Sequence, residues 1–163
     1  MRIVSIHVDY MKYTAVRPTK VAEELTEKEA EMTDGVVLMS CIEKMDEINP
    51  GMVVESATAN IQKRLLKIGC RRVMIYPYAH LTSSLASPDT AIMILKGLEE
   101  SLKNNGLEVS RAAFGWYKEF EMKSKGHPLA DLSMTICPYE GRDCDYHCPY
   151  CKSPVRKEDL LED

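Results

Sequence analysis

The sequence predicts an α+β fold in which two main amphipathic helices pack on a curved mixed sheet, or partly closed barrel, of about six strands. Two segments carry apolar residues at helical spacing between clear start and stop signals. Several shorter segments alternate in polarity or are apolar throughout, as strands are. A length of 163 residues with 45% hydrophobic content suits one domain with a sizeable core.

The first strand is expected at residues 2–8, where apolar and polar side chains alternate. The side chains expected to face inward are Val4, Ile6 and Val8, with Ser5 and His7 opposite. The charged stretch that follows predicts a short strand near Tyr13 and a short helix near residues 23–25.

Residues 36–42 are apolar on both faces and therefore predict a central strand. A turn at residues 49–51, Asn-Pro-Gly, precedes the first helix, which Gly69 ends. The buried stripe of this helix is expected to be Val54, Ala57, Ile61, Leu65 and Ile68. Residues 72–78 predict the next strand.

The polar loop at residues 79–86 leads into the second helix. Ser87 can cap this helix, and Pro88 suits its first position. The expected buried stripe is Ala91, Ile94, Leu95, Leu98 and Leu102. The helix should end at residues 105–106, Asn-Gly, before a strand at residues 107–114.

Residues 111–136 predict a hairpin whose two strands join at a tight connection, residues 125–128. The side chains expected on one face of its first strand are Trp116, Lys118, Phe120 and Met122. Those on the opposite, solvated face are Tyr117, Glu119, Glu121 and Lys123. The ammonium of Lys118 among large apolar side chains must reach water, find a partner or serve a site.

Composition excludes several classes of function. A net charge of −4 with 28% charged residues indicates a soluble protein and disfavours broad binding to nucleic-acid backbone. It leaves room for a small pocket that takes one end of an RNA. The sequence has no signal peptide and no apolar run of about 20 residues, so a cytoplasmic protein without a membrane span is expected. Signatures of P-loop, dinucleotide, serine-hydrolase and zinc-protease sites are absent.

Polar residues near strand ends are candidates for chemistry, and each also has an ordinary explanation. His80 lies on a loop directly after an apolar strand, where it could serve a site or bond loop backbone. Tyr117 and Lys118 could be plain strand residues, and His127, which precedes a proline, could close a turn. Asp131 could lie across the hairpin from Lys118, or it could be an exposed carboxylate.

Taken together, these segments resemble one family over residues 1–136. The segments YPYAHLTSSLASP, AAFGWYKEF and KGHPLADLS are similar to motifs of the archaeal editing domain of threonyl-tRNA synthetase, and HVDY resembles its opening motif. The resemblance implies a D-aminoacyl-tRNA deacylase-like fold, a homodimer, and a pocket for the aminoacylated 3′-terminal adenosine of threonine tRNA. It also implies that water hydrolyses the ester of a wrongly attached serine in this pocket, with no cofactor required for catalysis.

The resemblance assigns roles to individual residues by motif match. Lys118 becomes the main catalytic candidate, with Tyr117 and Phe114 at positions beside the ester. His80 stands where the family has the histidine that discriminates the amino-acid side chain, and Ala79 lines the same pocket.

Three further positions, in the matched motif or directly before it, depart from the family or extend the site. Asp131 stands where the family usually has glutamate, so a catalytic contact made by that carboxylate would be longer, rearranged or bridged here. His127 of the same motif is a candidate for substrate binding. Ser124 stands where relatives carry cysteine, which suggests that a thiol is not essential.

The tail, residues 137–163, carries four clustered cysteines outside the resemblance: Cys137, Cys144, Cys148 and Cys151. Thiolates bind zinc tetrahedrally and C-x-x-C is a usual half-site, so a structural zinc is expected, with His147 as a possible substitute ligand. Disulfides or free thiols are the alternatives. The last residues read as a charged linker or frayed helix.

The sequence thus predicts an aminoacyl-tRNA deacylase that removes L-serine from threonine tRNA. Two alternatives stay open: a D-aminoacyl-tRNA deacylase, and a non-catalytic zinc-bearing module that binds tRNA or protein. The length leaves no room for a synthetase catalytic domain, which is expected as a partner in cis or in trans.

Overall fold

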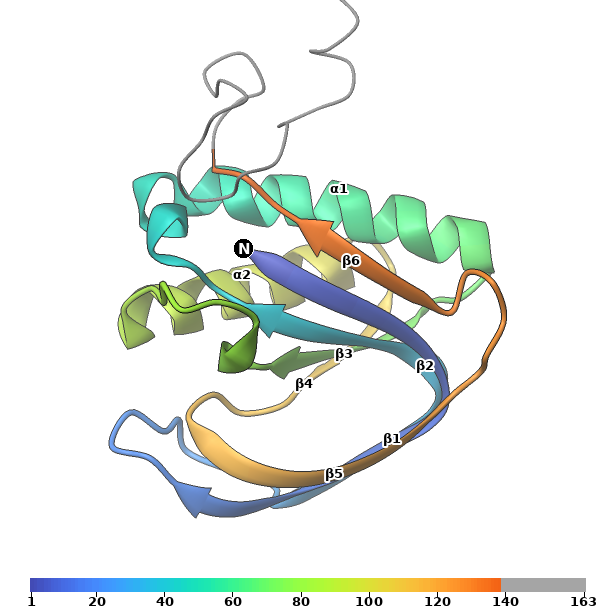
Figure 1. The fold of residues 1–163 in the computed structure, drawn as a ribbon, viewed down its shortest axis with the longest axis horizontal. Helices are drawn as coiled ribbons and strands as arrows, with labels where there is room; N and C mark the ends of the chain where they lie inside the picture. Colours follow the sequence, from blue (N-terminus) through green and yellow to red (C-terminus); the bar gives the residue numbers. More distant parts are fainter. Residues whose placement is uncertain (139–163) are drawn as a thin grey trace, which may run out of the picture.

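Two long helices lie side by side on one face of a strongly curved mixed sheet (Figure 1). The computed structural model describes residues 1–138. Within that range the strands are β1 (Arg2–Pro18), β2 (Glu29–Cys41), β3 (Arg72–Pro77), β4 (Glu108–Arg111), β5 (Trp116–Ser124) and β6 (Asp131–Thr135). The helices are α1 (Pro50–Ile68) and α2 (Pro88–Asn104), and the short 3₁₀ turns are η1 (Lys44–Ile48) and η2 (Ala79–Leu81).

The sheet has the order β4-β3-β2-β1-β5, with β6 also paired to β1. Strands β2, β3 and β4 are parallel, and the helices form the crossovers that parallel neighbours require. Strand β1 is antiparallel to β2, β5 and β6. Over residues 1–138, β4 forms one edge of the sheet and β5 with β6 the other, so the sheet is curved and open, as the curved mixed sheet expected from the sequence.

The first two strands are much longer than the sequence indicated. Strand β1 has 17 residues, joining the two strands expected at residues 2–8 and near Tyr13, with an irregularity between Val8 and Tyr10 in its pairing with β5. Strand β2 begins at Glu29, in a charged stretch whose outer side chains face solvent. The helix predicted near residues 23–25 is wrong, because these residues lie in the loop between β1 and β2.

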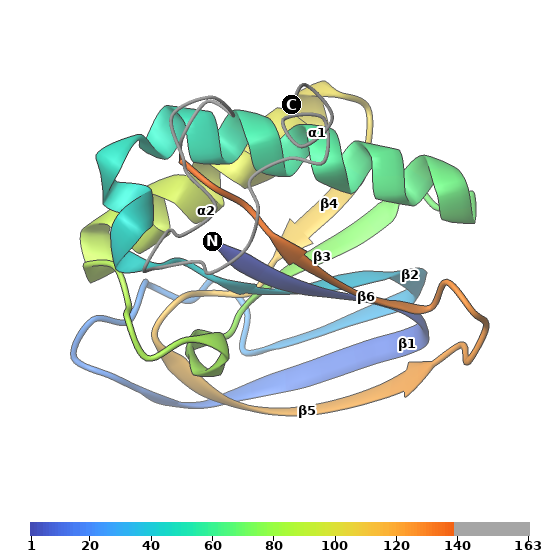
Figure 2. The same ribbon diagram turned by 45° about the horizontal axis from the view of Figure 1, so that its top comes forward.

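The predicted hairpin is also wrong, although both of its strands exist. Strand β5 pairs with Val8–Pro18 of β1, and β6 pairs with Arg2–Ile6. After the interruption at residues 125–130 the chain continues in the same direction, so β5 and β6 follow one another along one edge of β1 (Figure 2). Neither strand therefore faces the other.

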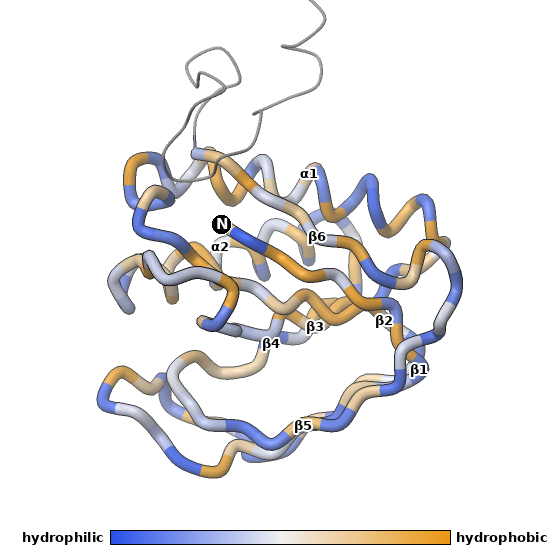
Figure 3. Tube along the Cα trace, in the orientation of Figure 1, coloured by the Kyte–Doolittle hydropathy of each residue, from blue (hydrophilic) through white to orange (hydrophobic). Residues whose placement is uncertain are grey.

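Apolar side chains fill both sides of the sheet. The larger core lies between the helices and the sheet, where Leu38 and Ile75 meet Ile61 and Leu98. The smaller core lies inside the curve of the sheet and includes Val8, Met11, Tyr13, Val37, Met39, Met74 and Tyr76. The second half of β2 and the middle of β3 are hydrophobic (Figure 3), as expected of central strands.

The expected inner face of β1 does contact the smaller core, but the opposite face is buried as well. Ser5 and His7 are almost fully covered, and Arg64 of α1 donates to Ser5 Oγ at 3.2 Å. The ammonium of Met1 is buried too, with Asp46 Oδ1 at 2.6 Å and the carbonyl of Ile136 at 2.8 Å. These polar contacts tie the start of β1 to α1, η1 and the end of β6.

The predicted helix boundaries are confirmed. Asn49 accepts a hydrogen bond from Met52 N at 3.1 Å at the start of α1, and Gly69 ends it with a φ of 67°. Ser87 accepts from Thr90 N at 3.4 Å at the start of α2. Neither helix of the described part of the chain is long and apolar enough to span a membrane.

Candidate active site

A cavity of roughly 440 Å³ opens between η2, the start of α2 and the beginning of β5. In two views η2 lies beside the start of β5 (Figures 1 and 2). The volume suits a small organic group, and most of the lining is aromatic or aliphatic with a few polar groups, as in ligand sites generally. Five predicted site residues line it: Ala79, His80, Phe114, Tyr117 and Lys118. The fold therefore brings together residues from two distant segments of the chain.

Lys118 supplies the cationic group of this cavity. Its Nζ donates to the carbonyl of Trp116 at 3.3 Å and lies 5.2 Å from the centre of the Tyr76 ring. Burial lowers the pKa of Lys118 to about 8, against the opposing effect of the Glu23 carboxylate. At pH 7 Lys118 is therefore protonated in most molecules, and the neutral amine becomes abundant above pH 8.

Tyr76 forms the aromatic floor beneath Lys118 and was not among the residues singled out from the sequence. The rings of Tyr13 and Phe120 pack edge-on against it, with centroids 5.7 and 5.6 Å away. Burial raises the pKa of the Tyr76 hydroxyl, so this group stays neutral across the physiological range. The only signal in the sequence was its place near the end of the apolar strand before His80.

His80 lies at the rim, in the middle of η2. Its ring packs edge-on against Tyr78 with centroids 5.2 Å apart, and both His80 and Ala79 are exposed. Tyr117 lies across the cavity on β5 with 57% of its surface exposed. The rim thus carries side chains that an entering ligand would meet before Lys118.

The wall of the cavity is the segment Phe114–Trp116, and Glu23 holds it in place. The Glu23 carboxylate accepts from Phe114 N at 2.7 Å, and its main-chain carbonyl accepts from Trp116 Nε1 at 2.8 Å. Gly115 between them has a φ of 78°, and a Cβ there would lie 2.7 Å from Cα of Ala22. The bend expected at Gly115 is thus one that only glycine can make.

The two remaining predicted residues lie elsewhere. Asp131 pairs with Ile6 on β1 whereas Lys118 pairs with Ala15, so roughly 30 Å of strand separates them. Of the two readings of Asp131, contact with Lys118 is wrong within one chain, because the hairpin that would create it does not form, and Asp131 is an exposed carboxylate on β6.

His127 also lies away from the cavity, near the end of β5. Its Nε2 is 2.8 Å from Nδ1 of His7, and its carbonyl accepts from Ala130 N at 2.9 Å. The alternative reading of His127, as a residue that closes a turn, fits this position.

The sequence matches a known family over most of its length. The family model of the archaea-specific editing domain of threonyl-tRNA synthetase matches residues 1–136. The chain belongs to this family. Its relatives include the threonine–tRNA ligases of Methanopyrus kandleri, 43% identical over 89% of this chain, and of Methanosarcina mazei, 36% identical over 100% of it. The chain spans about a quarter of these proteins, 23% and 25% of their lengths.

The editing domain also shares its fold with a solved structure of low sequence similarity. The c-Myc DNA unwinding element binding protein matches with a TM-score of 0.57 at 11% identity, over 83% of this chain and 98% of that one. At this identity the likeness concerns the fold alone. The predicted α+β fold is confirmed.

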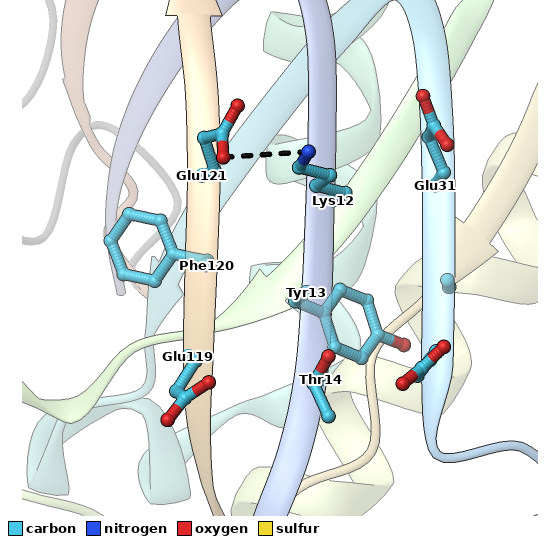
Figure 4. Close-up of a pocket in the computed structure, with 9 residues that line it drawn as sticks. Lys12, Tyr13, Thr14, Glu31, Glu119, Phe120 and Glu121 are labelled. Carbon is cyan, nitrogen blue, oxygen red and sulfur yellow. Dashed lines mark ion pairs between the residues drawn. The ribbon is translucent and has the colours of Figure 1, made fainter.

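A second groove of the editing domain lies on the polar face of β1, β2 and β5 (Figure 4). Its acidic lining consists of Glu29, Glu31, Glu119 and Glu121. Lys12 pairs with Glu121 at 3.4 Å, which leaves an excess of negative charge that would repel phosphate. None of the predicted site residues lines this groove, so the cavity at Lys118 is the candidate active site.

The metal site predicted in the tail, residues 137–163, falls largely outside residues 1–138. Cys144, Cys148 and Cys151 are beyond the described residues, and within residues 1–138 no three His, Cys, Asp or Glu side chains are grouped to hold a metal. The zinc stays a prediction.

Proposed function

We propose that this cavity hydrolyses the ester that joins L-serine to the 3′-terminal adenosine of threonine tRNA. The observation that carries the proposal is the position of Lys118, half-buried over an aromatic floor, in one cavity with His80 and Tyr117. Membership of the editing-domain family supports a proofreading role. The choice of serine as the substrate rests on the resemblance of the motifs.

An aminoacyl ester is already activated, so its hydrolysis needs a positioned water and stabilisation of the developing oxyanion. The Lys118 ammonium can provide this stabilisation, because the apolar surroundings reduce the effective dielectric and strengthen its field. Its ring contact with Tyr76 holds the ammonium near the wall without neutralising it. The Phe114 N–H is taken by Glu23, so a backbone donor to the oxyanion must come from another residue.

Selectivity is the harder part of the task, because serine lacks only the methyl group of threonine. A missing methyl in a pocket gives about 1–3 kcal/mol of discrimination, which is too little for accurate charging. A second site that rejects the larger amino acid or misaligns its water overcomes this limit. We assign this rejection to His80, which stands at the cavity rim on η2.

The proposed partners follow from the same assignment. We propose that the chain acts on tRNA charged by a threonyl-tRNA synthetase catalytic domain, in cis or in trans, and that it forms a homodimer. Sedimentation of the purified chain at micromolar concentration tests the homodimer, which a single monomeric species would contradict.

One assay separates the candidate functions. Purified protein is incubated with L-seryl-, L-threonyl- and D-aminoacyl-tRNA, and the release of each amino acid is followed. Rapid release of L-serine alone is the expected result. Preferential release of D-amino acids would replace this function with D-aminoacyl-tRNA deacylation, and release of none would leave a non-catalytic module.

A further inference from the structure

Glu23 makes more polar contacts with the wall of the cavity than any predicted site residue does. Its carboxylate accepts two hydrogen bonds from the Arg111 guanidinium, at 2.6 and 3.1 Å, and one from Phe114 N at 2.7 Å. Its main-chain N–H donates to the carbonyl of Phe114 at 3.0 Å, and its carbonyl accepts from Trp116 Nε1 at 2.8 Å. One residue of the β1–β2 loop therefore fixes both ends of the segment 114–116.

This segment carries the acceptor of the Lys118 ammonium. Lys118 Nζ donates to the carbonyl of Trp116, whose indole is anchored on Glu23. A path of direct contacts thus runs from Glu23 through Trp116 to Lys118. Displacement of the segment would move the carbonyl on which the ammonium is oriented.

Glu23 also acts on Lys118 through its charge. The side chain is only 11% exposed, and burial by itself would raise the pKa of its carboxyl, but the hydrogen bonds from Arg111 and Phe114 outweigh burial and keep the pKa low. The carboxylate is therefore ionised, and its field favours the charged form of Lys118 against burial. A second cation, Lys96 Nζ, lies 3.6 Å away and leaves this sign unchanged.

A purely structural ion pair between Glu23 and Arg111 is the alternative explanation. Arg111 has a second carboxylate partner, Glu99 of α2, at 2.8 Å, which ties β4 to α2 without Glu23. Glu99 does not contact the segment 114–116 through any bond among the described residues. The two carboxylates of Arg111 therefore share a structural role and differ in their connection to the cavity.

We propose that Glu23 is the positioning residue for Lys118, because it fixes the segment 114–116 whose Trp116 carbonyl orients the ammonium. The inference rests on the proposed hydrolysis for its functional meaning. It extends the site to a loop that neither the motif match nor the helical and strand patterns identified.

The test compares Glu23→Gln with Glu99→Gln. The glutamine at position 23 keeps the size of the side chain and one acceptor but removes the charge. The Lys118 titration is followed by NMR of labelled lysine in the absence of tRNA, with Lys118→Met to assign the signal. We expect Glu23→Gln to lower the titration midpoint by roughly half a pH unit or more, and Glu99→Gln to leave it unchanged.

Trp116 provides a second readout because it is the only tryptophan of the chain. Its emission should change in Glu23→Gln and stay as in the wild type in Glu99→Gln. Serine release by Glu23→Gln should show a lower kcat with little change in KM, and its decline at alkaline pH should begin at a lower pH. Should Glu23→Gln fail to fold, Glu23→Asp replaces it, with a wild-type Lys118 midpoint and altered Trp116 emission expected.

An unchanged Lys118 midpoint together with unchanged Trp116 emission in a folded Glu23→Gln variant would overturn the proposal. Equal shifts in the Glu23 and Glu99 variants would overturn it as well, since both would then act through Arg111. Wild-type protein that releases no serine would refute the proposed hydrolysis, while the titration and the emission would still decide whether Glu23 positions Lys118.

Discussion

The Lys118 ammonium lies over the ring of Tyr76, with Nζ 5.2 Å from the ring centre. A cation in this position gains about 1–2 kcal/mol from the ring as water is excluded. This interaction offsets part of the desolvation that lowers the lysine pKa. It explains how a half-buried side chain can remain the cationic group of the cavity at neutral pH.

Lys118→Met should lower the rate of serine release by about 10²–10³-fold, the range for loss of one oxyanion-stabilising group. Methionine keeps an apolar stem over Tyr76 but removes the charge. The matched control is Lys12→Met, which removes an exposed lysine from the polar face of the same sheet. Deacylation assays on L-seryl-tRNA measure both variants, and a wild-type rate in Lys118→Met would contradict the proposed mechanism.

His80→Ala should begin to release correctly attached threonine, because the side chain that rejects the extra methyl at the rim is gone. We expect the preference for serine over threonine to fall at least about tenfold, within the discrimination that one methyl can supply. Ser83→Ala, an exposed change on the same loop, serves as the control. A variant that still rejects threonine as the wild type does would exclude His80 from this role.

The pair His7 and His127 predicts acid sensitivity of the fold. Leu129 N donates to His127 Nδ1 at 3.2 Å, so the neutral His127 carries its proton on Nε2 and donates to His7 Nδ1. Burial, followed by the charge of Lys125, lowers the pKa of His7. The unfolded chain then binds this proton more readily, and stability is lost as pH falls below the unfolded pKa of about 6.5.

Urea denaturation at pH 7.5 and pH 5.5 measures this effect. His7→Gln should lose less stability between the two pH values than the wild type does, because the titrating group is removed. His80→Gln, which changes an exposed histidine outside this pair, should lose as much as the wild type. Equal losses in all three proteins would exclude His7 as a cause of the acid sensitivity.

Gly115→Ala should destabilise the domain by about 2–4 kcal/mol, combining a left-handed backbone with overpacking against the β1–β2 loop. The added Cβ would lie 2.7 Å from Cα of Ala22 and 2.8 Å from the carbonyl of Val21. Gly69→Ala has a similar φ of 67° but meets nothing within 4 Å, so it should cost only the backbone part, about 1–2 kcal/mol. Thermal denaturation compares the two, and equal losses would disprove the steric contact.

The cysteine tail should bind one structural zinc ion per chain when the full-length protein is purified without chelator. Substitution of Cys148 and Cys151 by serine should abolish the bound metal, because it removes the C-x-x-C half-site. Serine release should survive in that variant, since no metal is needed for the proposed hydrolysis. Metal analysis that finds less than half an equivalent of zinc in the unaltered protein would count against the site.

The sequence was sufficient for local features of this fold. Asn49, Gly69 and Ser87 marked the ends of the helices correctly, because capping depends on a few neighbouring residues. The apolar run at residues 36–42 predicted the central place of β2, because a strand that is apolar on both faces must be covered on both. The hairpin was wrong because pairing depends on distant partners, and the alternation of β5 is compatible with any neighbour.

The residues of the candidate site likewise differ in whether local sequence was enough to identify them. His80, Tyr117 and Lys118 were found because their segments resemble motifs of the family. The structure places all three in one cavity. Glu23 was missed because its partner Arg111 lies 88 residues further along the chain, and the sequence around Glu23 indicated only a short helix. A single buried carboxylate in a charged loop gives no signal until the fold is known.

The placement of β5 and β6 along one edge of β1 has a consequence for the order in which the domain can assemble. During synthesis β1 can pair with β2 early, but its other edge, 17 residues long, stays bare until residues 116–135 have emerged. An exposed edge of that length invites pairing with other chains, and contacts so distant in sequence slow folding. Since β5 carries Lys118, the proposed catalytic lysine reaches its cavity only when β5 docks on β1.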